Sequence, residues 1–260
     1  MAGMWFPAGL SARLWGQRIS RPFRDKPAPA IFHFSPLVRH FPPGALFEGV
    51  VPETEWHTPE ACVQAANEVG APAVWLGGVE PLLHPAIGKV TTALAQTGRY
   101  VFLDTAGADL RMRIHEFQPA ERFFFAFQLS GDEIAQGVRA GCGDLQNVIE
   151  VLRIVKLSGF FACVHLVVGA QTSVAAVEPF FRMLEAGRVD GIAASSGGAS
   201  AGLASDAILG KRLAEITEII PSRRWRKISR ILEASYLQTA TVKELPNIQA
   251  RGTDACEESA

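Results

Sequence analysis

The sequence predicts an α/β fold, namely a partial (β/α)6 barrel of the TIM type with a single core. Six apolar runs follow one another along the chain, and a helical pattern follows each after a short link, which favours parallel strands joined by helices. The runs are nearly continuous rather than alternating, as is typical of strands buried on both faces. With 260 residues, 48% of them hydrophobic, the chain can bury one sizeable core. A doubly wound open sheet is the alternative, because hydrophobic periodicity does not distinguish the two.

The predicted strands and helices alternate in order. The strands are expected at residues 29–36, 72–78, 99–105, 122–131, 160–169 and 189–198. The helices are expected at residues 58–70, 85–98, 108–117, 144–159, 173–187 and 205–220. In the first of these helices Thr58 suits the N-cap, Pro59 the first position and Gly70 the end. In either architecture the ligand site lies beyond the carboxyl ends of the strands.

Two further segments flank this series. Residues 4–24 combine large apolar side chains, two tryptophans among them, with arginines, and so predict a basic amphipathic helix. Such a helix can lie in a membrane interface, or it can cap the open bottom of the barrel, which is the interpretation preferred here. Residues 222–227 form a basic cluster at an expected helix start. The chain is therefore divided into an amphipathic segment at 1–25, the barrel at 26–240 and a polar, disordered tail at 241–260.

Charge and cysteine spacing exclude several classes of protein. A net charge of −1 gives no electrostatic case for binding nucleic acid. No apolar run reaches the roughly 18 residues that span a bilayer, and the N-terminal basic residues follow the apolar ones, unlike those of a signal peptide. We expect a cytoplasmic protein, with residues 4–24 as the candidate for peripheral contact at the inner membrane face. Cys62, Cys142, Cys163 and Cys256 lack metal-binding spacing, so no metal site is expected, and Cys163 is assigned to the core.

The turn after the second strand, GGVEP, is the first candidate binding site. Gly77 and Gly78 allow the backbone to approach a ligand, and Glu80 can accept a hydrogen bond from an ammonium group. Glu80 and Asp104 both follow or end strands, so they are candidates for an acid/base pair, or else they cap backbone N–H groups. His165, inside an apolar strand, is either a satisfied core histidine or a ligand.

This turn resembles the one that holds S-adenosylmethionine in radical-SAM enzymes. From about residue 26 to residue 236 the chain is similar to the adenosyl-hopene transferases, the radical-SAM enzymes of hopanoid lipid synthesis. The stretches that carry the resemblance are PEACVQAANEVGAP, EPLLH, VIEVLRIVKLSGF, AVEPFFRMLEAGRVDGI and RRWR. It implies a partial barrel of the radical-SAM type. It also implies a set of cofactor contacts, namely Gly77, Gly78, Glu80, Thr105, Ser130 and His165.

The chain departs from the family at most of these contacts. Val79 stands at the second family glycine, and Thr105 is followed by alanine where the family has asparagine. Ser130 falls in a segment that replaces an H-x-D-G motif, and His165 replaces an asparagine. After the sixth strand, the run SSGGASAGLAS can wrap a phosphate through its backbone or fill an emptied site.

The family's cluster motif is also replaced. Its three cysteines, spaced CxxxCxxC, align with His40, Gly44 and Phe47, of which only His40 can ligate a metal. A 4Fe–4S cluster is therefore not expected, and S-adenosylmethionine is the candidate cofactor.

Three functions follow from these observations. The favoured one is a pseudoenzyme that acts as a partner or regulator in hopanoid or other membrane-lipid metabolism, beside an active homologue or another lipid-biosynthesis protein. The alternative is a cluster-free binder or enzyme that uses S-adenosylmethionine or another nucleotide. An active adenosyltransferase would need cluster ligands from elsewhere in the chain.

Overall fold

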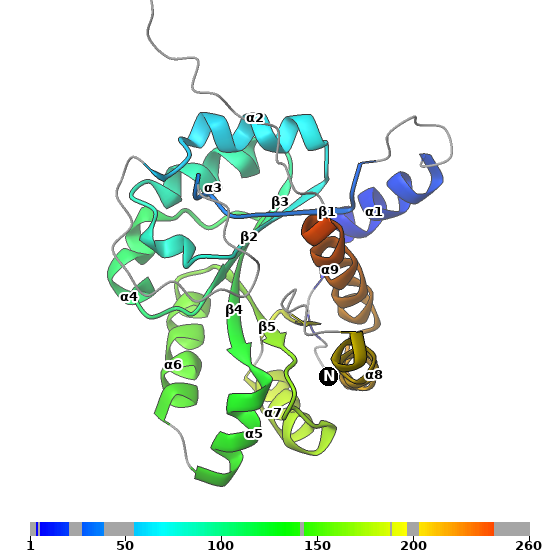
Figure 1. Cartoon of the computed structure of the whole chain (residues 1–260). Helices are drawn as coiled ribbons and strands as arrows, with labels where there is room; N and C mark the ends of the chain where they lie inside the picture. Colours follow the sequence, from blue (N-terminus) through cyan, green and yellow to red (C-terminus); the bar gives the residue numbers. More distant parts are fainter. Residues whose placement is uncertain are drawn as a thin grey trace, which may run out of the picture.

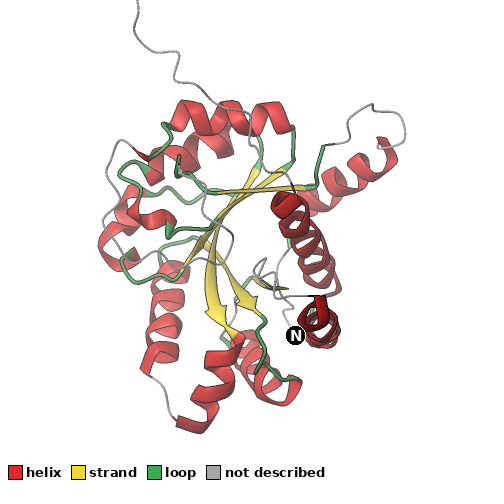
Figure 2. Ribbon diagram, in the orientation of Figure 1, coloured by secondary structure: helices red, strands yellow, loops and turns green. Residues whose placement is uncertain are grey.

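The computed structural model describes residues 4, 6–20, 28–38, 55–140, 143–187, 189–196 and 203–241. Its strands form one six-stranded parallel sheet in the order β1-β2-β3-β4-β5-β6. The order follows the chain without the reversal that defines a doubly wound sheet, so that alternative is wrong. The sheet curls into a half-barrel with helices around it, which confirms the predicted partial barrel (Figure 2).

Each strand lies within one of the six predicted apolar runs. The strands are β1 (Ile31–Phe34), β2 (Ala73–Leu76), β3 (Tyr100–Thr105), β4 (Phe123–Ser130), β5 (Phe161–Val167) and β6 (Gly191–Ser195). Every residue of β1, β2, β3 and β6 is buried. The near-continuous runs therefore reflect strands that are covered on both faces.

The helices agree with the prediction except at two places. The α-helices are α1 (Ala8–Ser20), α2 (Pro59–Val69), α3 (Ile87–Gln96), α4 (Leu110–Arg113), α5 (Gly131–Ala140), α6 (Gly143–Leu157), α7 (Val174–Ala186), α8 (Leu203–Ile219) and α9 (Arg223–Thr241), and the 3-10 helices are η3 (Pro81–Leu83) and η4 (Ile114–Glu116). The helix expected at 108–117 is split into α4 and η4. Helix α5 was not predicted. The basic cluster at 222–227 was expected to start a helix, and α9 begins there. As expected, Thr58 caps α2 by accepting from Ala61 N.

An aromatic row lines the inside of the curled sheet. Trp75, Phe102, Phe124 and Phe161 are register partners on four neighbouring strands, and successive rings stack with centroids 4.9, 4.9 and 5.2 Å apart. Trp225 of α9 meets the second and third rings edge-on, at 6.4 and 6.5 Å. Because side chains alternate between the faces of a strand, residues two further along from this row also point inward.

Helix α9 closes the open side of the half-barrel. It contacts both edge strands, β6 and β1, and it lies across the gap between them (Figure 1). Ser229 Oγ accepts from Ala194 N at 3.0 Å, and the Glu233 carboxylate accepts from Ser196 N at 2.8 Å. Backbone N–H groups along the edge of β6 are thereby hydrogen-bonded to side chains of α9 instead of to a seventh strand.

Helix α1 covers the opposite end of the barrel from the strand carboxyl ends. Phe6, Leu10 and Leu14 belong to the main core, and Phe6 meets Trp225 edge-on at 5.4 Å. Arg13 Nη1 donates to Gly98 O, just before β3, at 2.6 Å. The N-terminal segment therefore caps the barrel bottom, as the preferred interpretation expected. In the part of the chain that the structure describes, no helix combines the length and hydrophobicity needed to cross a membrane.

Candidate functional site

The turn after β2 brings its backbone close to two inward-facing side chains. Gly78 has a φ of +95°, a conformation that favours glycine. At Gly77 an added Cβ would lie 3.0 Å from His33 Nε2 and 3.3 Å from Asp104 Oδ2. The geometry of the fold therefore disfavours a side chain at both positions, through the backbone at Gly78 and through close neighbours at Gly77.

Glu80 is held by donors from its own and the next strand–helix turn. Its carboxylate accepts from Leu82 N at 3.0 Å, from Thr105 Oγ1 at 2.6 Å and from Ala106 N at 2.8 Å. It thus caps η3, which confirms the capping alternative, and it ties the β2 turn to the β3 turn. Burial raises the pKa of Glu80, and the three hydrogen bonds oppose that rise. Two predicted contact residues, Glu80 and Thr105, are therefore direct partners.

A hydrogen-bonded chain crosses the inside of the barrel one layer above the aromatic row. Asp104 Oδ2 lies 2.8 Å from His165 Nδ1, and His165 Nε2 lies 2.7 Å from Ser195 Oγ. The three residues come from β3, β5 and β6 and are all buried. With the proton on Nδ1, His165 donates to the carboxylate and Ser195 donates to Nε2. His165 is therefore a satisfied core histidine that is bonded to an acid from the candidate pair.

The order Asp104, His165, Ser195 matches the contacts of a nucleophilic triad. In a triad, however, the serine must reach a substrate carbonyl beside donors that stabilise an oxyanion. Ser195 has an exposed fraction of 0%, and the N–H of the next residue already donates to Glu233. Because Ser195 is buried in this way, the hydrogen bonds between Asp104, His165 and Ser195 serve as a structural link between β3, β5 and β6.

Two buried polar atoms, one in this layer and one in the aromatic row beneath it, have no hydrogen-bond partner in the described structure. They are Asp104 Oδ1, an acceptor, and Trp75 Nε1, a donor. Their residues have exposed fractions of 3% and 0%. Buried polar groups are nearly always satisfied, so these two atoms are exceptions. His33 lines the same layer, and burial lowers its pKa to about 4 despite the nearby charge of Asp104, so its ring is neutral at pH 7.

The remaining predicted contacts lie elsewhere or outside the described residues. Ser130 caps the first turn of α5, where its Oγ accepts from Glu133 N at 3.3 Å. The structure does not bring it into contact with the other predicted residues. His40, Gly44 and Phe47 lie outside the described residues, as does most of the SSGGASAGLAS run.

The sequence did not indicate that Ser195 and His33 line this layer, nor that Trp75 lies in the aromatic row beneath it. The sequence feature that could have indicated them is the two-residue period of the strands. Residues two apart share a face, so Asp104 and His165 follow the inward faces of Phe102 and Cys163. The register between strands, which the sequence did not give, was needed to put Ser195 beside His165.

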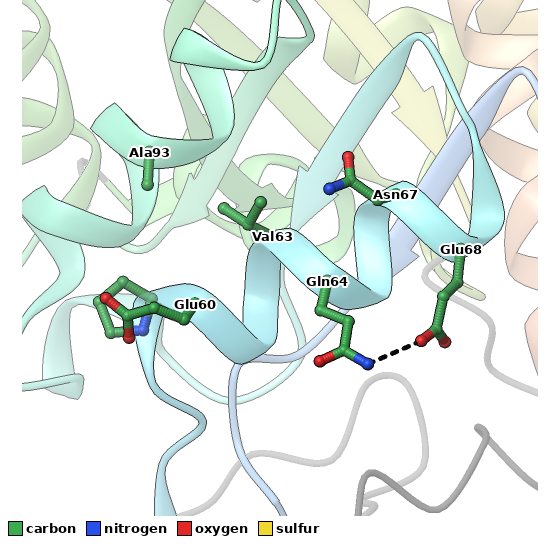
Figure 3. A pocket seen from close by; sticks show the side chains of 7 residues that line it. Glu60, Val63, Gln64, Asn67, Glu68 and Ala93 are labelled. Carbon is green, nitrogen blue, oxygen red and sulfur yellow. Dashed lines mark hydrogen bonds between the residues drawn. The ribbon is translucent and has the colours of Figure 1, made fainter.

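The described structure also has a shallow hollow on the outside of the barrel, between α2 and α3. It has a volume of about 360 Å³. Its lining includes Glu60, Val63, Gln64, Asn67, Glu68 and Ala93 (Figure 3). The polar side chains are exposed, and Gln64 donates to Glu68 at 3.0 Å. This hollow lies on the outer helices, whereas ligands of such folds bind at the carboxyl ends of the strands.

Comparison with solved structures identifies the fold. The structure of Streptococcus suis SuiB bound to S-adenosylmethionine is similar, with a TM-score of 0.51 and 14% sequence identity over 81% of this chain and 48% of SuiB. SuiB bound to its precursor peptide SuiA gives a TM-score of 0.51 and 12% identity over 72% and 42%. SuiB is a radical-SAM enzyme with a half-barrel. This chain has the radical-SAM half-barrel fold.

The likeness to SuiB is one of fold, because the identity is low and the chain spans less than half of SuiB's length. No family model matches the chain, and no curated protein matches it in sequence.

The described thiols do not fit a conventional 4Fe–4S cluster, which is held by thiolates. Cys62 and Cys163 are both buried, on α2 and β5. Burial raises the pKa of Cys62 to about 12 and raises that of Cys163 as well, so both remain protonated. Among the described residues no three histidine, cysteine or acidic side chains converge as metal ligands.

Residues 36–38 and 55–57 pair with each other and form a short neck. Val38 N donates to Glu55 O at 2.7 Å and His57 N donates to Pro36 O at 2.9 Å. Val79 of the β2 turn is buried against Leu37 and Trp56 of this neck. The valine side chain thus has a packing role that a glycine would not serve.

Proposed function

We propose that this protein is a cluster-free relative of the radical-SAM enzymes that acts as a non-catalytic partner or regulator in hopanoid or related membrane-lipid metabolism. The fold supports the kinship, and the sequence resemblance to adenosyl-hopene transferases supports the metabolic setting. The observation that carries the proposal is the donor set, since one imidazole replaces three thiolates. Two hydrogen bonds, between Glu80 and Thr105 and between His165 and Ser195, pair these side chains within the protein. Such pairing is consistent with a scaffold that no longer needs these groups for a cofactor.

The first test is a measurement of iron and acid-labile sulfide after anaerobic reconstitution, with an absorption spectrum. We expect folded protein without stoichiometric iron or sulfide. The variant His40→Ala is the matched control, because it removes the one aligned side chain that can ligate a metal. A stoichiometric cluster that His40→Ala abolishes would contradict the proposal.

The partner role needs its own measurement. We expect the purified chain to form a complex with an active adenosyl-hopene transferase, detected by size-exclusion chromatography with light scattering. A chain that stays separate from the transferase at micromolar concentrations would count against an active homologue as the partner.

A second candidate function is a cluster-free binder of S-adenosylmethionine or another nucleotide. It is favoured by the orphaned atoms Asp104 Oδ1, in the hydrogen-bonded layer, and Trp75 Nε1, in the aromatic row beneath it. Glu80 can also accept a further hydrogen bond, because a carboxylate has about four lone-pair sites and only three donors are bonded to it here.

Calorimetric titration with S-adenosylmethionine separates the two functions. The binder predicts a measurable affinity that falls about tenfold or more in Glu80→Gln, which removes the charge facing an ammonium group. Glu60→Gln, on the exposed face of α2, is the matched control and should bind as the wild type does. The scaffold predicts no affinity in any of the three proteins.

A further inference from the structure

Three arginines converge at the bottom of the barrel, the end opposite the candidate site. Arg13 lies on α1, Arg99 immediately precedes β3, and Arg122 immediately precedes β4. Arg122 Nη1 and Arg13 Nη2 lie 3.1 and 3.5 Å from the point that a Cβ on Gly98 would occupy, so the two guanidinium groups are neighbours. We call these three residues the arginine cluster.

One member of the cluster has a purely structural role. Arg99 donates to Ala66 O at 3.0 Å, to Ala71 O at 3.1 Å and to Thr97 Oγ1 at 2.7 Å. Ala66 O belongs to the last turn of α2, where a cation interacts favourably with the helix dipole. Partial burial and the charge of Arg13 both lower the pKa of Arg99, which is the mark of a like charge close by.

The other two members keep unused donors. A guanidinium carries five N–H groups in a rigid fork. The Arg13 guanidinium makes one hydrogen bond, to Gly98 O. The Arg122 guanidinium lies over the Tyr100 ring, 5.9 Å from its centroid, and makes no hydrogen bond in the described structure. The free donors of both side chains therefore face the same space beside Gly98.

No carboxylate neutralises the cluster within the described ranges. None of its members takes part in an ion pair there, whereas Arg226 and Arg230 of α9 both contact Glu218. The arginine cluster is therefore left with converging positive charge. Like charges repel, and a bound anion would remove that repulsion.

We propose that the arginine cluster binds a phosphate group, with Arg13 and Arg122 as its two donors and Arg99 as a fixed positive charge behind them. Guanidinium forks match phosphate oxygens in geometry and charge. The phosphate belongs either to a free phosphate compound or to the headgroup of an anionic lipid. In the second case the protein meets a membrane through charge, because the apolar side chains of Phe6 and, on α1, of Leu10 and Leu14 are buried in the core.

The test compares the full chain with the double variant Arg13→Gln/Arg122→Gln. Inorganic phosphate is titrated at constant ionic strength, and co-sedimentation is measured with vesicles of phosphatidylcholine alone and mixed with phosphatidylglycerol. Arg153→Gln is the matched control, because Arg153 is exposed on α6 and makes no ion pair in the described structure. A melting curve of each protein confirms that it is folded, and Arg122→Gln alone serves if the double variant is not.

We expect binding by the wild type and by Arg153→Gln, and a loss of about tenfold or more in the double variant. Binding of inorganic phosphate would assign the site to a free phosphate compound, and binding confined to phosphatidylglycerol vesicles would assign it to a lipid headgroup. The proposal is overturned if the wild type binds neither probe, or if Arg153→Gln loses as much affinity as the double variant.

Discussion

Gly77 and Gly78 differ in what an added side chain would meet. At Gly77 the obstacle is steric, since His33 Nε2 and Asp104 surround the position of a Cβ. At Gly78 the obstacle is the backbone, whose φ of +95° disfavours any L side chain, and Ser35 Cβ also lies 3.2 Å from a Cβ there. At both positions it is the fold itself that disfavours a larger residue.

We therefore expect Gly77→Ala and Gly78→Ala each to lower the free energy of unfolding, by about 1–3 kcal/mol for the first and about 1–2 kcal/mol for the second. Gly210→Ala, in helix α8 with no atom within 4 Å of its Cβ position, should instead raise it by up to about 1 kcal/mol. Urea unfolding without any ligand measures all three. Equal stability of Gly77→Ala and wild type would show that the space beside Asp104 is open.

His33 gives the protein a pH dependence whose sign can be worked out. Its pKa is about 4 in the folded protein, chiefly through burial, against an ordinary value of 6.5. Between these values the unfolded chain binds more protons, so the free energy of unfolding falls as the pH falls from 6.5 towards 4. The loss from this residue is on the order of 3 kcal/mol.

The variant His33→Gln should show a flatter pH dependence over that window, because glutamine does not titrate. The free energy of unfolding is measured in urea at several pH values between 4 and 7. His57 and His84 have pKa values lowered in the same direction, chiefly by burial, and they remain in the variant as a shared background. Parallel curves for the two proteins would contradict the assignment to His33.

At the scale of elements, the described apolar side chains Leu10 and Leu14 of helix α1 are buried within the protein. Leu10 is completely buried in the main core, and Arg13 on the same helix reaches Gly98 O at the end of α3. The pattern of residues 4–24 was compatible with a membrane surface as well as with the preferred barrel cap, because both environments bury one face of a helix.

Leu10→Ala is expected to lower the free energy of unfolding by about 2–5 kcal/mol, since it leaves a cavity at the barrel bottom. Ala12→Ser, on the exposed face of α1, should change it by less than about 0.5 kcal/mol. Thermal and urea unfolding check both variants. If Leu10→Ala left stability unchanged, α1 would not be part of the core.

At the scale of the whole molecule, the half-barrel is completed by a helix. Gly191 at the start of β6 lies against Trp225 of α9, so closely that an added Cβ would be 1.9 Å from Trp225 Cε2. Trp225 Nε1 also donates to Asp190 O at 3.0 Å. This contact joins β6 to α9 and holds the Trp225 ring in the interior against the aromatic row.

Gly191→Ala should therefore lower the free energy of unfolding by about 3 kcal/mol or more, because ring and backbone have no room to separate. In the background Trp225→Leu the same glycine substitution should have a much smaller effect. A double-mutant cycle in urea measures this coupling. Additive effects of the two substitutions would mean that α9 does not seat against β6 as described.

The sequence by itself determined the six strand–helix units, the bounds of most elements and the lack of metal-binding spacing among the four cysteines. It did so because burial on both faces of a strand, helix capping by Thr58 and ligand chemistry are properties of neighbouring residues. It missed α5, whose glycine-rich segment at 131–143 gives a weak helical signal, although Ser130 caps it and Asp132 and Glu133 fill its first turn.

Only the tertiary structure decided what the strand ends do. The pair Glu80–Thr105 and the chain Asp104–His165–Ser195 join residues 25 to 61 positions apart. Their contacts depend on strand register and on the curvature of the sheet, which bring distant side chains to one layer. The closure of the barrel by α9 and the meeting of Arg13 with Arg122 have the same origin. Local sequence patterns encode which face of an element is buried, whereas the partner on the other side is set by how the elements pack.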